Sequence, residues 1–523
     1  MNKNGLIYDV EDKPKLGQLI VFALQQLLAI ITATIAVPSI IGLPAQIPAA
    51  ILGAGVGTIV YLLFTKFKSP VFLGSSFAFL SSLFVAVTFG YCGILLGAIF
   101  AGLVYVVIAI IIHFAGTKWV SKLMPPVIIG PTVALIGLNL AGNAMGDIVT
   151  ANSSILNGGY NLVALLCGLV AFLTIVICSS QKKFKTMKLI PFIIGIGAGY
   201  ACAAFFSIFG YACDADYLKI INWAPLVDNF STVKFTSFFN YPRFGLIEAI
   251  KEMVNGEAGI AGASTLTGAG VAKIAIAFIP VALVVFAEHI ADHKNLGSII
   301  GRDLVEGEPG LEKTLLGDGV GSIAGTIFGI CPNTTYGESV GCVAITKNAS
   351  IRSIFVAAIM CIVLSFVSPI MALLQTIPSC VMGGVCLTLY GFIAVSGLKM
   401  FKEIDLGENK NLFTVSAILI AGIGGLAIKI PYGIVNGSAS VEVIEITEIA
   451  TALILGICVY ALMNYIEKKN ATIAPAEGEE DEPESLIVAA VGPNTSLEVG
   501  GTEEAASEEA PAEEAPADTT DAQ

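Results

Sequence analysis

Four acidic side chains inside or beside long apolar runs are the residues of this chain that could do chemistry. Glu288 and Asp292 lie four residues apart in VVFAEHIADHK, a spacing that places them on one face of a helix. Asp318 lies in LLGDGVGS, and Glu338 lies in CPNTTYGESVGCVAITK. An acid at membrane depth costs roughly 2.5–3.5 kcal/mol on insertion scales, so it usually faces a substrate or ion path. We therefore predict a functional site that contains these acids.

Proton exchange is the chemistry that such residues favour. Burial penalises the charged form of a carboxylate, and a second carboxylate in the same cavity penalises it further. One of the pair can then bind and release a proton near neutral pH. His289 and His293 flank the helix face of Glu288 and Asp292. We predict that Glu288 or Asp292 carries the proton, and the full set of candidates is Glu288, His289, Asp292, His293 and Asp318.

Histidines four residues apart beside acids could instead hold a metal ion, as in zinc hydrolases. The sequence has no HExxH motif, and its third histidine, His113, stands at the end of a different apolar run. No nucleophile with an adjacent base is evident either. We therefore predict a protein that is not an enzyme and that uses no metal and no cofactor, with the proton as its coupling ion. A metal-dependent membrane enzyme is the alternative of a different class, and it predicts bound zinc.

The composition predicts that a polytopic membrane protein carries these acids. Of the 523 residues, 55% are hydrophobic and 13% are charged, the mean hydropathy is +0.84, and apolar runs of about 20 residues recur. The net charge of −13 belongs to the end of the chain, because the residues before 470 hold 27 basic and 25 acidic side chains. The Ala/Glu/Pro-rich segment 470–523 is too polar to build a core, and we predict a disordered cytoplasmic tail.

Fourteen apolar runs are candidate membrane spans. A cytoplasmic N-terminus, residues 1–16 without a cleavable signal peptide, puts 21 of the 27 Lys and Arg residues on the cytoplasmic side, as the positive-inside rule requires. An even number of spans then leaves the C-terminus in the cytoplasm as well. The candidate spans are 17–37, 47–65, 71–88, 92–114, 121–143, 160–180, 188–209, 271–293, 313–330, 331–346, 353–374, 378–398, 411–430 and 445–466.

Two of these spans, 71–88 and 331–346, are interrupted by short extended stretches at corresponding places. Each is the third span of its half, and each contains proline, glycine and small polar residues: SPVFLGSSFAF in the first and PNTTYGE in the second. Seven spans per half make the halves inverted repeats, and paired breaks of this kind indicate a transporter's binding site at the midplane. Non-helical backbone at membrane depth must line a cavity enclosed by protein or filled with water. The alternatives are a chance placement of the breaks or an extramembrane loop around Glu338.

Two further features carry structural rather than chemical predictions. The eleven cysteines lie mostly in apolar runs and show no CxxC spacing, so we predict free thiols without disulfides. Residues 210–270 form the one long external connection: its aromatic first part is predicted to lie at the membrane interface, and 255–270 is predicted to be a flexible loop.

The strings LGSSFAF, AEHIADH and PNTTYGESVGCVAITK, in this order and on these spans, resemble the nucleobase–ascorbate transporter family, and bacterial uracil permeases within it. The resemblance runs from about residue 14 to 465, and PNTTYGE is its most specific part. It implies proton symport of uracil across the plasma membrane by alternating access, without nucleic acid as a partner, and a homodimer formed through the gate domains. The implied core domain is 17–114 (spans 1–4) and 271–374 (spans 8–11), and the implied gate domain is 121–209 (spans 5–7) and 378–466 (spans 12–14).

The resemblance also implies roles for individual residues. Glu288 and Glu338 would bind the pyrimidine ring, and Phe77 and Gly337 would offer backbone N–H groups to its carbonyl oxygens. Tyr336 would shape the pocket, and the small side chain of Ala33 would leave room for the ligand.

Three positions depart from the family's pattern, and they bear on substrate and coupling. Asp292 stands where uracil permeases have histidine and purine transporters have an acid, Gln26 replaces a histidine, and Ser339 replaces an asparagine. A xanthine or urate symporter is therefore the alternative within the family. A transporter of inorganic or dicarboxylate anions is disfavoured, because two acids would repel an anion. Asp318 matches an acidic position of the purine branch, and we predict for it either support of the turn between spans nine and ten or a structural role at a helix end.

Overall fold

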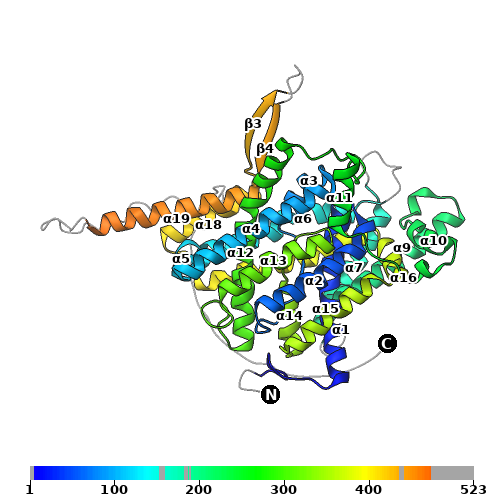
Figure 1. Ribbon diagram of the computed structural model, residues 1–523, viewed down its shortest axis with the longest axis horizontal. Helices are drawn as coiled ribbons and strands as arrows, with labels where there is room; N and C mark the ends of the chain where they lie inside the picture. The colour runs from blue at the N-terminus through cyan, green and yellow to red at the C-terminus, as the bar shows by residue number, and fades with distance from the viewer. Residues whose placement is uncertain (1–4, 152–159, 182–186, 188–189, 435–440, 473–523) are drawn as a thin grey trace, which may run out of the picture. The chain divides into compact units, whose positions relative to one another are not determined.

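The computed structural model describes residues 5–151, 160–181, 187, 190–434 and 441–472 (Figure 1). Within these residues, nine helices are long and apolar enough to cross a membrane. They are α1 (Leu16–Ile40), α2 (Ile47–Phe64), α4 (Gly90–Ala115), α6 (Pro126–Ile148), α7 (Leu162–Ser180), α9 (Pro191–Ala212), α12 (Gly268–Ile300), α17 (Ser379–Lys399) and α19 (Glu448–Thr472). The chain is a helical polytopic membrane protein, as the composition predicts. Most of the predicted acidic tail, residues 473–523, lies outside the described part.

Shorter elements connect or complete these helices, and the contacts among residues Met1–Glu467 form one compact unit. The shorter helices are α3 (Leu80–Val87), α5 (Lys118–Leu123), α10 (Ala224–Ser231), α11 (Gly245–Asn255), α13 (Leu311–Phe328), α14 (Gly337–Thr346), α15 (Ile351–Ser365), α16 (Ser368–Gln375) and α18 (Asn409–Ile423). Both interrupted spans begin with a strand: β1 (Leu73–Ser75) precedes α3, and β2 (Asn333–Thr335) precedes α14.

Two sets of helices pack mainly among themselves. One set is α1, α2, α4, α12, α13 and α15, and the other is α6, α7, α9, α17 and α18. The sets meet where α12 contacts α6 and where α1 contacts α9 and α17. Within the first set α13 approaches α2 so closely that a Cβ atom on Gly53 would lie 2.3 Å from the carbonyl oxygen of Gly325. Small residues at such a contact allow two membrane helices to pack backbone against backbone.

Residues 411–430 do not form a single helix, contrary to the prediction. The helix α18 ends before Gly424 and Gly425, and Gly425 has a φ of +71°, which residues with a Cβ atom rarely adopt. The chain then forms β3 (Ile428–Ile434), which pairs antiparallel with β4 (Val441–Ile446) in the hairpin labelled in Figure 1. The apolar run hides this strand, because a short apolar stretch fits a buried strand as well as the end of a helix.

The long connection between α9 and α12 contains two helices, α10 and α11, that the sequence analysis did not predict. Residues 256–267, which cover most of the predicted flexible loop, have no helix or strand. In the aromatic part, Phe235 and Tyr241 are 78% and 72% exposed. This exposure is compatible with the predicted place at the membrane interface, which stays a prediction.

A buried carboxylate on α11 caps a membrane helix. The side chain of Glu252 accepts hydrogen bonds from the backbone N–H groups of Tyr91 (2.9 Å) and Cys92 (2.8 Å) in the first turn of α4. It also accepts one from Gly259 N at 2.7 Å. The first N–H groups of a helix have no partner within the helix, and the helix dipole favours an anion there. Glu252 therefore fastens the long connection to α4.

Replacing Glu252 with alanine is expected to destabilise the folded protein by roughly 2–4 kcal/mol, because three N–H groups lose their acceptor. Thermal unfolding of the detergent-purified protein, followed by loss of monodisperse protein on size exclusion, measures the effect. Glu257→Ala, which removes an exposed acid of the same connection, is the matched control. Equal midpoints for the two variants would contradict the proposed cap.

The N-terminal segment is packed, although its polar composition does not predict this. Tyr8 pairs in parallel with Asn348, just after the end of α14, and Ala349 N donates to Tyr8 O at 2.9 Å. Leu6 and Val10 have no exposed surface. The segment therefore lies against the residues that follow α14, at one end of the helix bundle.

Candidate functional site

The two interrupted spans pair with each other. The strands β1 and β2 form an antiparallel ribbon in which Leu73 lies opposite Thr335 and Gly74 opposite Thr334. One residue beyond, Tyr336 N donates to Phe72 O at 3.1 Å. Because the strands are antiparallel, α3 and α14 leave this ribbon from its two opposite ends. Segments that are about 260 residues apart in the sequence are thus one structural element.

Side chains from α2 and α13 satisfy the backbone of the ribbon. The hydroxyl oxygen of Thr58 accepts a hydrogen bond from Leu73 N at 2.9 Å. Asn333 N donates to the hydroxyl of Ser322 at 3.0 Å, and the Asn333 amide nitrogen donates to Gly53 O at 2.9 Å. Non-helical backbone at membrane depth needs such partners, since lipid supplies none. Asn333 of the second break, together with Thr58 of α2 and Ser322 of α13, therefore supports the backbone of the site.

Three of the predicted acids lie beside the ribbon. Glu338 is the second residue of α14, and Glu288 and Asp292 lie on α12. Asp292 accepts a hydrogen bond from the Thr335 hydroxyl at 2.9 Å, and both acids on α12 interact electrostatically with Glu338. Asp292 is buried, whereas the two glutamates are partly exposed, and Glu288 Oε2 has no hydrogen-bond partner among the described residues. The glutamates therefore keep hydrogen-bonding capacity that a ligand could use.

Tyr336 and Gly337 stand where β2 passes into α14. The Tyr336 hydroxyl donates to Ser75 O on β1 at 2.8 Å, and it lies 3.5 Å from the Thr34 hydroxyl on α1. Gly337 is exposed, and a Cβ atom there would lie 3.6 Å from Asp292 Oδ1. The buried tyrosine thus holds the ribbon closed, while the start of α14 presents backbone N–H groups beside the acids.

Phe77 follows β1, and it packs against Tyr390 on α17, a residue that the sequence analysis missed. The two ring centroids lie 5.3 Å apart with an interplanar angle of 86°. Both side chains are buried, and the Tyr390 hydroxyl has no hydrogen-bond partner among the described residues. A buried tyrosine hydroxyl usually finds a partner. Tyr390 therefore offers a hydroxyl from the second helix set that has the thiol of Cys386 as its neighbour. The sequence signal for it is a phenol within an apolar span.

The two histidines of α12 form a separate network on the next face of the helix. His289 Nδ1 lies 2.7 Å from Asp318 Oδ2, and its Nε2 lies 3.0 Å from the Thr314 hydroxyl, both on α13. His293 Nε2 lies 2.7 Å from the Tyr61 hydroxyl on α2. The two imidazole centroids are 4.1 Å apart. All these side chains are buried.

The predicted set of five proton-coupling candidates is thus divided in space. Glu288 and Asp292 lie beside Glu338 and the ribbon, whereas His289 faces α13 and His293 faces α2. Asp318 lies in the interior of α13 and bonds to His289 on α12, so it has no structural role at a helix end. It also lies near Thr334 and Thr335 of β2, and its predicted support of the turn between spans nine and ten stays a prediction. The sequence could not show this, since no periodicity reveals which helix packs against which.

Two of the three residues that depart from the family's pattern contact each other. The Gln26 amide nitrogen on α1 donates to the Ser339 hydroxyl on α14, and the same hydroxyl accepts from Phe72 N at 3.0 Å. Ala33, further along α1, is fully buried. Gln26 and Ser339 together fasten α1 and α14 to the ribbon, so the two departures form one matched contact.

Substitution of Gly74 by alanine is expected to destabilise the protein by roughly 1–3 kcal/mol, the usual cost of overpacking. The added Cβ atom would lie 2.2 Å from the ring of Tyr336, which would have to leave its hydrogen bond to Ser75 O. The thermal unfolding midpoint measures the change. Gly341→Ala is the control, because nothing lies within 4 Å of a Cβ atom at that position of α14. A Gly74→Ala midpoint no lower than that of the control would contradict this packing.

Comparison with known proteins gives concordant results for most of the chain. A family model described as "Permease family" matches residues 17–430. The chain is 37% identical over 457 residues to the uracil permease of Bacillus caldolyticus, which covers 87% of this chain and 94% of that protein. It is 36% identical over 437 residues to the uracil permease of Bacillus subtilis (strain 168), with 83% and 92% covered. For the uracil permease of Escherichia coli (strain K12) the identity is 32% over 444 residues, with 84% and 92% covered.

Solved structures resemble this chain in fold at low sequence identity. The transmembrane domain of the cyanobacterium bicarbonate transporter BicA matches with a TM-score of 0.51 and 14% identity, covering 78% of this chain and 95% of that one. The murine Solute Carrier 26 family member A9 anion transporter, in its inward-facing state, matches with a TM-score of 0.55 and 10% identity, covering 87% and 69%. At such identities the likeness concerns the fold alone.

Proposed function

The chain belongs to the permease family of nucleobase–ascorbate transporters, and from this premise we propose that it imports uracil together with a proton. Membership rests on the family match over residues 17–430 and on uracil permeases that are 32–37% identical over most of the chain. The protein is therefore a membrane-embedded nucleobase transporter and not an enzyme. Uracil as the substrate, the proton and the transport cycle are our proposal.

The observation that carries the proposal is the convergence of two partly exposed glutamates and the start of α14 at the paired strands. A uracil ring presents N–H donors and C=O acceptors. We assign the N–H groups to the carboxylates of Glu288 and Glu338, which can only accept when ionised. The carbonyl oxygens take backbone N–H groups of Phe77 and Gly337 at the ends of the ribbon. A hydrogen bond to a charged group contributes roughly 1.5–3 kcal/mol, so these contacts would dominate the affinity.

The aromatic residues complete the proposed site. Phe77 supplies a flat face beside the ring, and Tyr336 fixes the ribbon that positions it. Ala33 keeps the adjacent part of α1 small. Tyr390 adds a hydroxyl group from α17, so a ligand at Phe77 would contact both sets of helices. This double contact supports alternating access, in which one set moves against the other around the bound ring.

The proposal includes the finer architecture. Fourteen spans in two inverted halves would form a core domain from spans 1–4 and 8–11 and a gate domain from spans 5–7 and 12–14, and two copies would associate through their gate domains. The pairing of the third span of each half in one ribbon supports the inverted arrangement. The proposed orientation has both termini in the cytoplasm, with the chain in the plasma membrane.

Two groups are candidates for the coupled proton. One is the cluster of Glu288, Asp292 and Glu338, in which three acids in one region cannot all ionise without repulsion. The other is the pair of His289 and Asp318, whose Nδ1 and Oδ2 atoms lie 2.7 Å apart, close enough to share a proton. The first cluster touches the proposed ligand and so couples the proton to binding directly. The second would couple it through the packing of α12 on α13.

Import of a purine, xanthine or urate, is the second candidate function, and Asp292 is the residue that favours it. The acid at this position resembles the purine branch of the family, and its hydrogen bond from Thr335 places it at the ribbon. It would offer an acceptor to a further N–H group of a larger ring.

Uptake of labelled uracil into vesicles that contain the purified protein tests the proposal. We expect accumulation under a pH gradient that is acidic on the side from which uracil enters, loss of accumulation with an uncoupler, and weak competition by xanthine. Uptake that ignores the gradient would refute proton coupling. If unlabelled xanthine blocks the uptake fully at concentrations where unlabelled uracil blocks it poorly, the substrate must be assigned as a purine.

A further inference from the structure

A polar pocket lies at the end of the helix bundle opposite to the N-terminal segment. The helix α15 defines the two ends: Ile351 N, at its start, bonds to Val10 O, and Phe366 O, just past its end, bonds to Asn240 N. Two adjoining cavities of about 430 and 550 Å³ lie beside Asn240, within the size range of small-molecule sites. Both are lined by Pro48, Asn240, Tyr241, Pro242 and Gln375. With the N-terminus in the cytoplasm, this outer amide pocket opens outside the cell.

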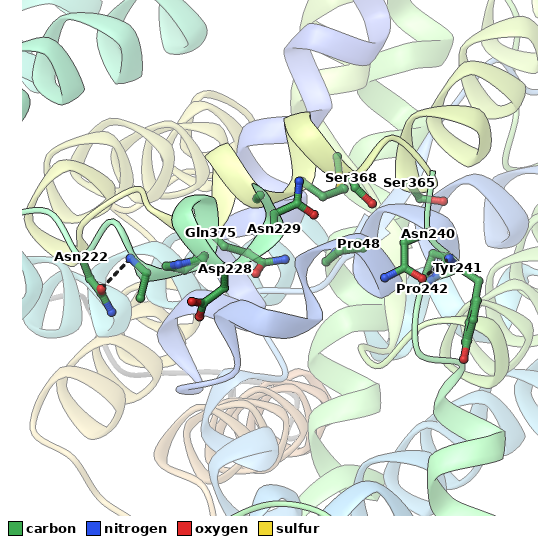
Figure 2. A pocket seen from close by; sticks show the side chains of 14 residues that line it. Pro48, Asn222, Asp228, Asn229, Asn240, Tyr241, Pro242, Ser365, Ser368 and Gln375 are labelled. Carbon is green, nitrogen blue, oxygen red and sulfur yellow. Dashed lines mark hydrogen bonds between the residues drawn. The ribbon is translucent and has the colours of Figure 1, made fainter. Parts of the chain in front are cut away.

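Four carboxamide side chains from three separate segments line the outer amide pocket: Asn222, Asn229, Asn240 and Gln375 (Figure 2). They reach it from α10 and the residues just before it, from the loop that precedes α11, and from α16. A carboxamide carries both a donor and an acceptor. The pocket therefore presents the complement of a ligand that itself has amide groups.

Hydrogen bonds to the backbone orient three of these amides. Asn222 Oδ1 accepts from Ala224 N at 3.0 Å, and Asn240 Oδ1 accepts from Tyr241 N at 2.9 Å. A backbone N–H group only donates, so both oxygens are engaged and both NH₂ groups are left for a ligand. Asn229 has the reverse orientation, because its amide nitrogen donates to Ser237 O at 2.9 Å and leaves Oδ1 as an acceptor. Preorganised donors and acceptors lower the entropy cost of binding.

The charges around the pocket balance. Asp228 and Glu248 contribute two negative charges, and Arg243 and Lys251 contribute two positive charges. Glu248 and Lys251 also pair with each other at 2.7 Å. No net charge selects for an ion, so the lining favours a neutral ligand with several amide groups.

We propose that the outer amide pocket is a second binding site for a neutral uracil-type ring, as the free base or in a nucleoside. This inference rests on the proposed function, since it deepens the assignment of the substrate class. The NH₂ group of Asn240 would donate to a ring carbonyl, and Asn229 Oδ1 would accept from a ring N–H, whereas Asn222 lies at the far end of the pocket (Figure 2). The pocket would hold substrate at the outer face before it reaches the site at the paired strands.

Equilibrium dialysis of labelled uracil against the full-length protein in lipid nanodiscs tests the inference. We expect two uracil molecules per wild-type chain and one in Glu338→Ala, which loses the central site. The double variant N229A/N240A is expected to keep the central molecule and to bind the second about tenfold or more weakly, a loss of about 1.4 kcal/mol. Asn255→Ala, which changes an asparagine at the end of α11 outside the pocket, is the matched control.

The two proposals fail in different ways. If wild-type protein binds one uracil and Glu338→Ala binds none, the outer site is absent while the proposed function stands. If wild-type protein binds no uracil, the proposed function itself fails, and this inference fails with it. N240D keeps the shape of the side chain but replaces its donor with an acceptor. If the double variant is folded correctly, N240D must weaken the second site as the double variant does. Uridine tested on Glu338→Ala then shows whether the pocket takes the free base or the nucleoside, and either result supports it.

Discussion

Replacing Glu338 with alanine is expected to lower uracil uptake by about 10- to 100-fold. The carboxylate stands at the second position of α14, is partly exposed, and faces the two acids of α12. In the proposed complex it accepts from the ring, and loss of a charged hydrogen bond worth up to roughly 3 kcal/mol corresponds to about two powers of ten in affinity. Initial rates of labelled uracil uptake into vesicles, at equal protein content, measure the effect.

Two variants control the Glu338 experiment. Glu338→Gln keeps one acceptor oxygen but loses the charge, so its rate should fall between those of wild-type protein and the alanine variant. Glu306→Ala removes an acid from an exposed loop and should transport normally. If Glu338→Ala transports uracil at the wild-type rate, the proposal that Glu338 binds the ligand is wrong.

The sequence was sufficient to predict that both spans are interrupted by non-helical backbone, and the physical reason is local. Proline, glycine and small polar residues in an otherwise apolar run cannot continue a membrane helix, so a cavity must receive that backbone. The register of the ribbon could not be predicted, because three-residue strands carry no alternation to read. The partners Thr58, Asn333 and Ser322 became evident only from the packing of α2 and α13 around β1 and β2.

Residues on other helices escaped the sequence analysis for a related reason. Helical periodicity places Glu288 with Asp292 and His289 with His293, and both pairs are found on adjacent faces of α12. It does not reveal that the second face meets Asp318 or that Tyr390 meets Phe77, since these contacts join distant segments. The hairpin of β3 and β4 was missed because an apolar strand beside an apolar helix looks like a longer helix.

The hydrogen bonds of His289 indicate how many protons its pair with Asp318 holds. The Thr314 hydroxyl donates to Leu311 O at 3.1 Å, so it faces His289 Nε2 with a lone pair, and that nitrogen must donate. Nδ1 then shares one further proton with Asp318 Oδ2. With this proton the pair is neutral overall, and without it the pair carries one buried negative charge. Burial makes the charged state costly, so the network is suited to taking up a proton as the surrounding helices close.

Asp318→Asn is accordingly expected to abolish accumulation of uracil under a pH gradient while leaving exchange of uracil across the membrane. Asparagine cannot release a proton, so the pair of His289 and residue 318 stays neutral in this variant. Uracil can then bind to the ligand site and leave it without net movement of a proton. Accumulation should fall to the level that wild-type protein reaches with an uncoupler. Counterflow, in which labelled uracil exchanges for unlabelled uracil inside the vesicle, should continue and should lose its dependence on pH.

Comparison with two neighbouring variants separates proton transfer from positioning. Thr314→Val removes the other partner of His289 but leaves the titratable pair, so it should accumulate uracil, with a shifted pH profile. His289→Gln removes the base and should resemble Asp318→Asn, and the double variant should be no worse than either single one, because both residues act in one step. If Asp318→Asn accumulates uracil as wild-type protein does, proton coupling must be assigned to Glu288, Asp292 and Glu338. The bound ligand would then set the affinity of these carboxylates for the proton.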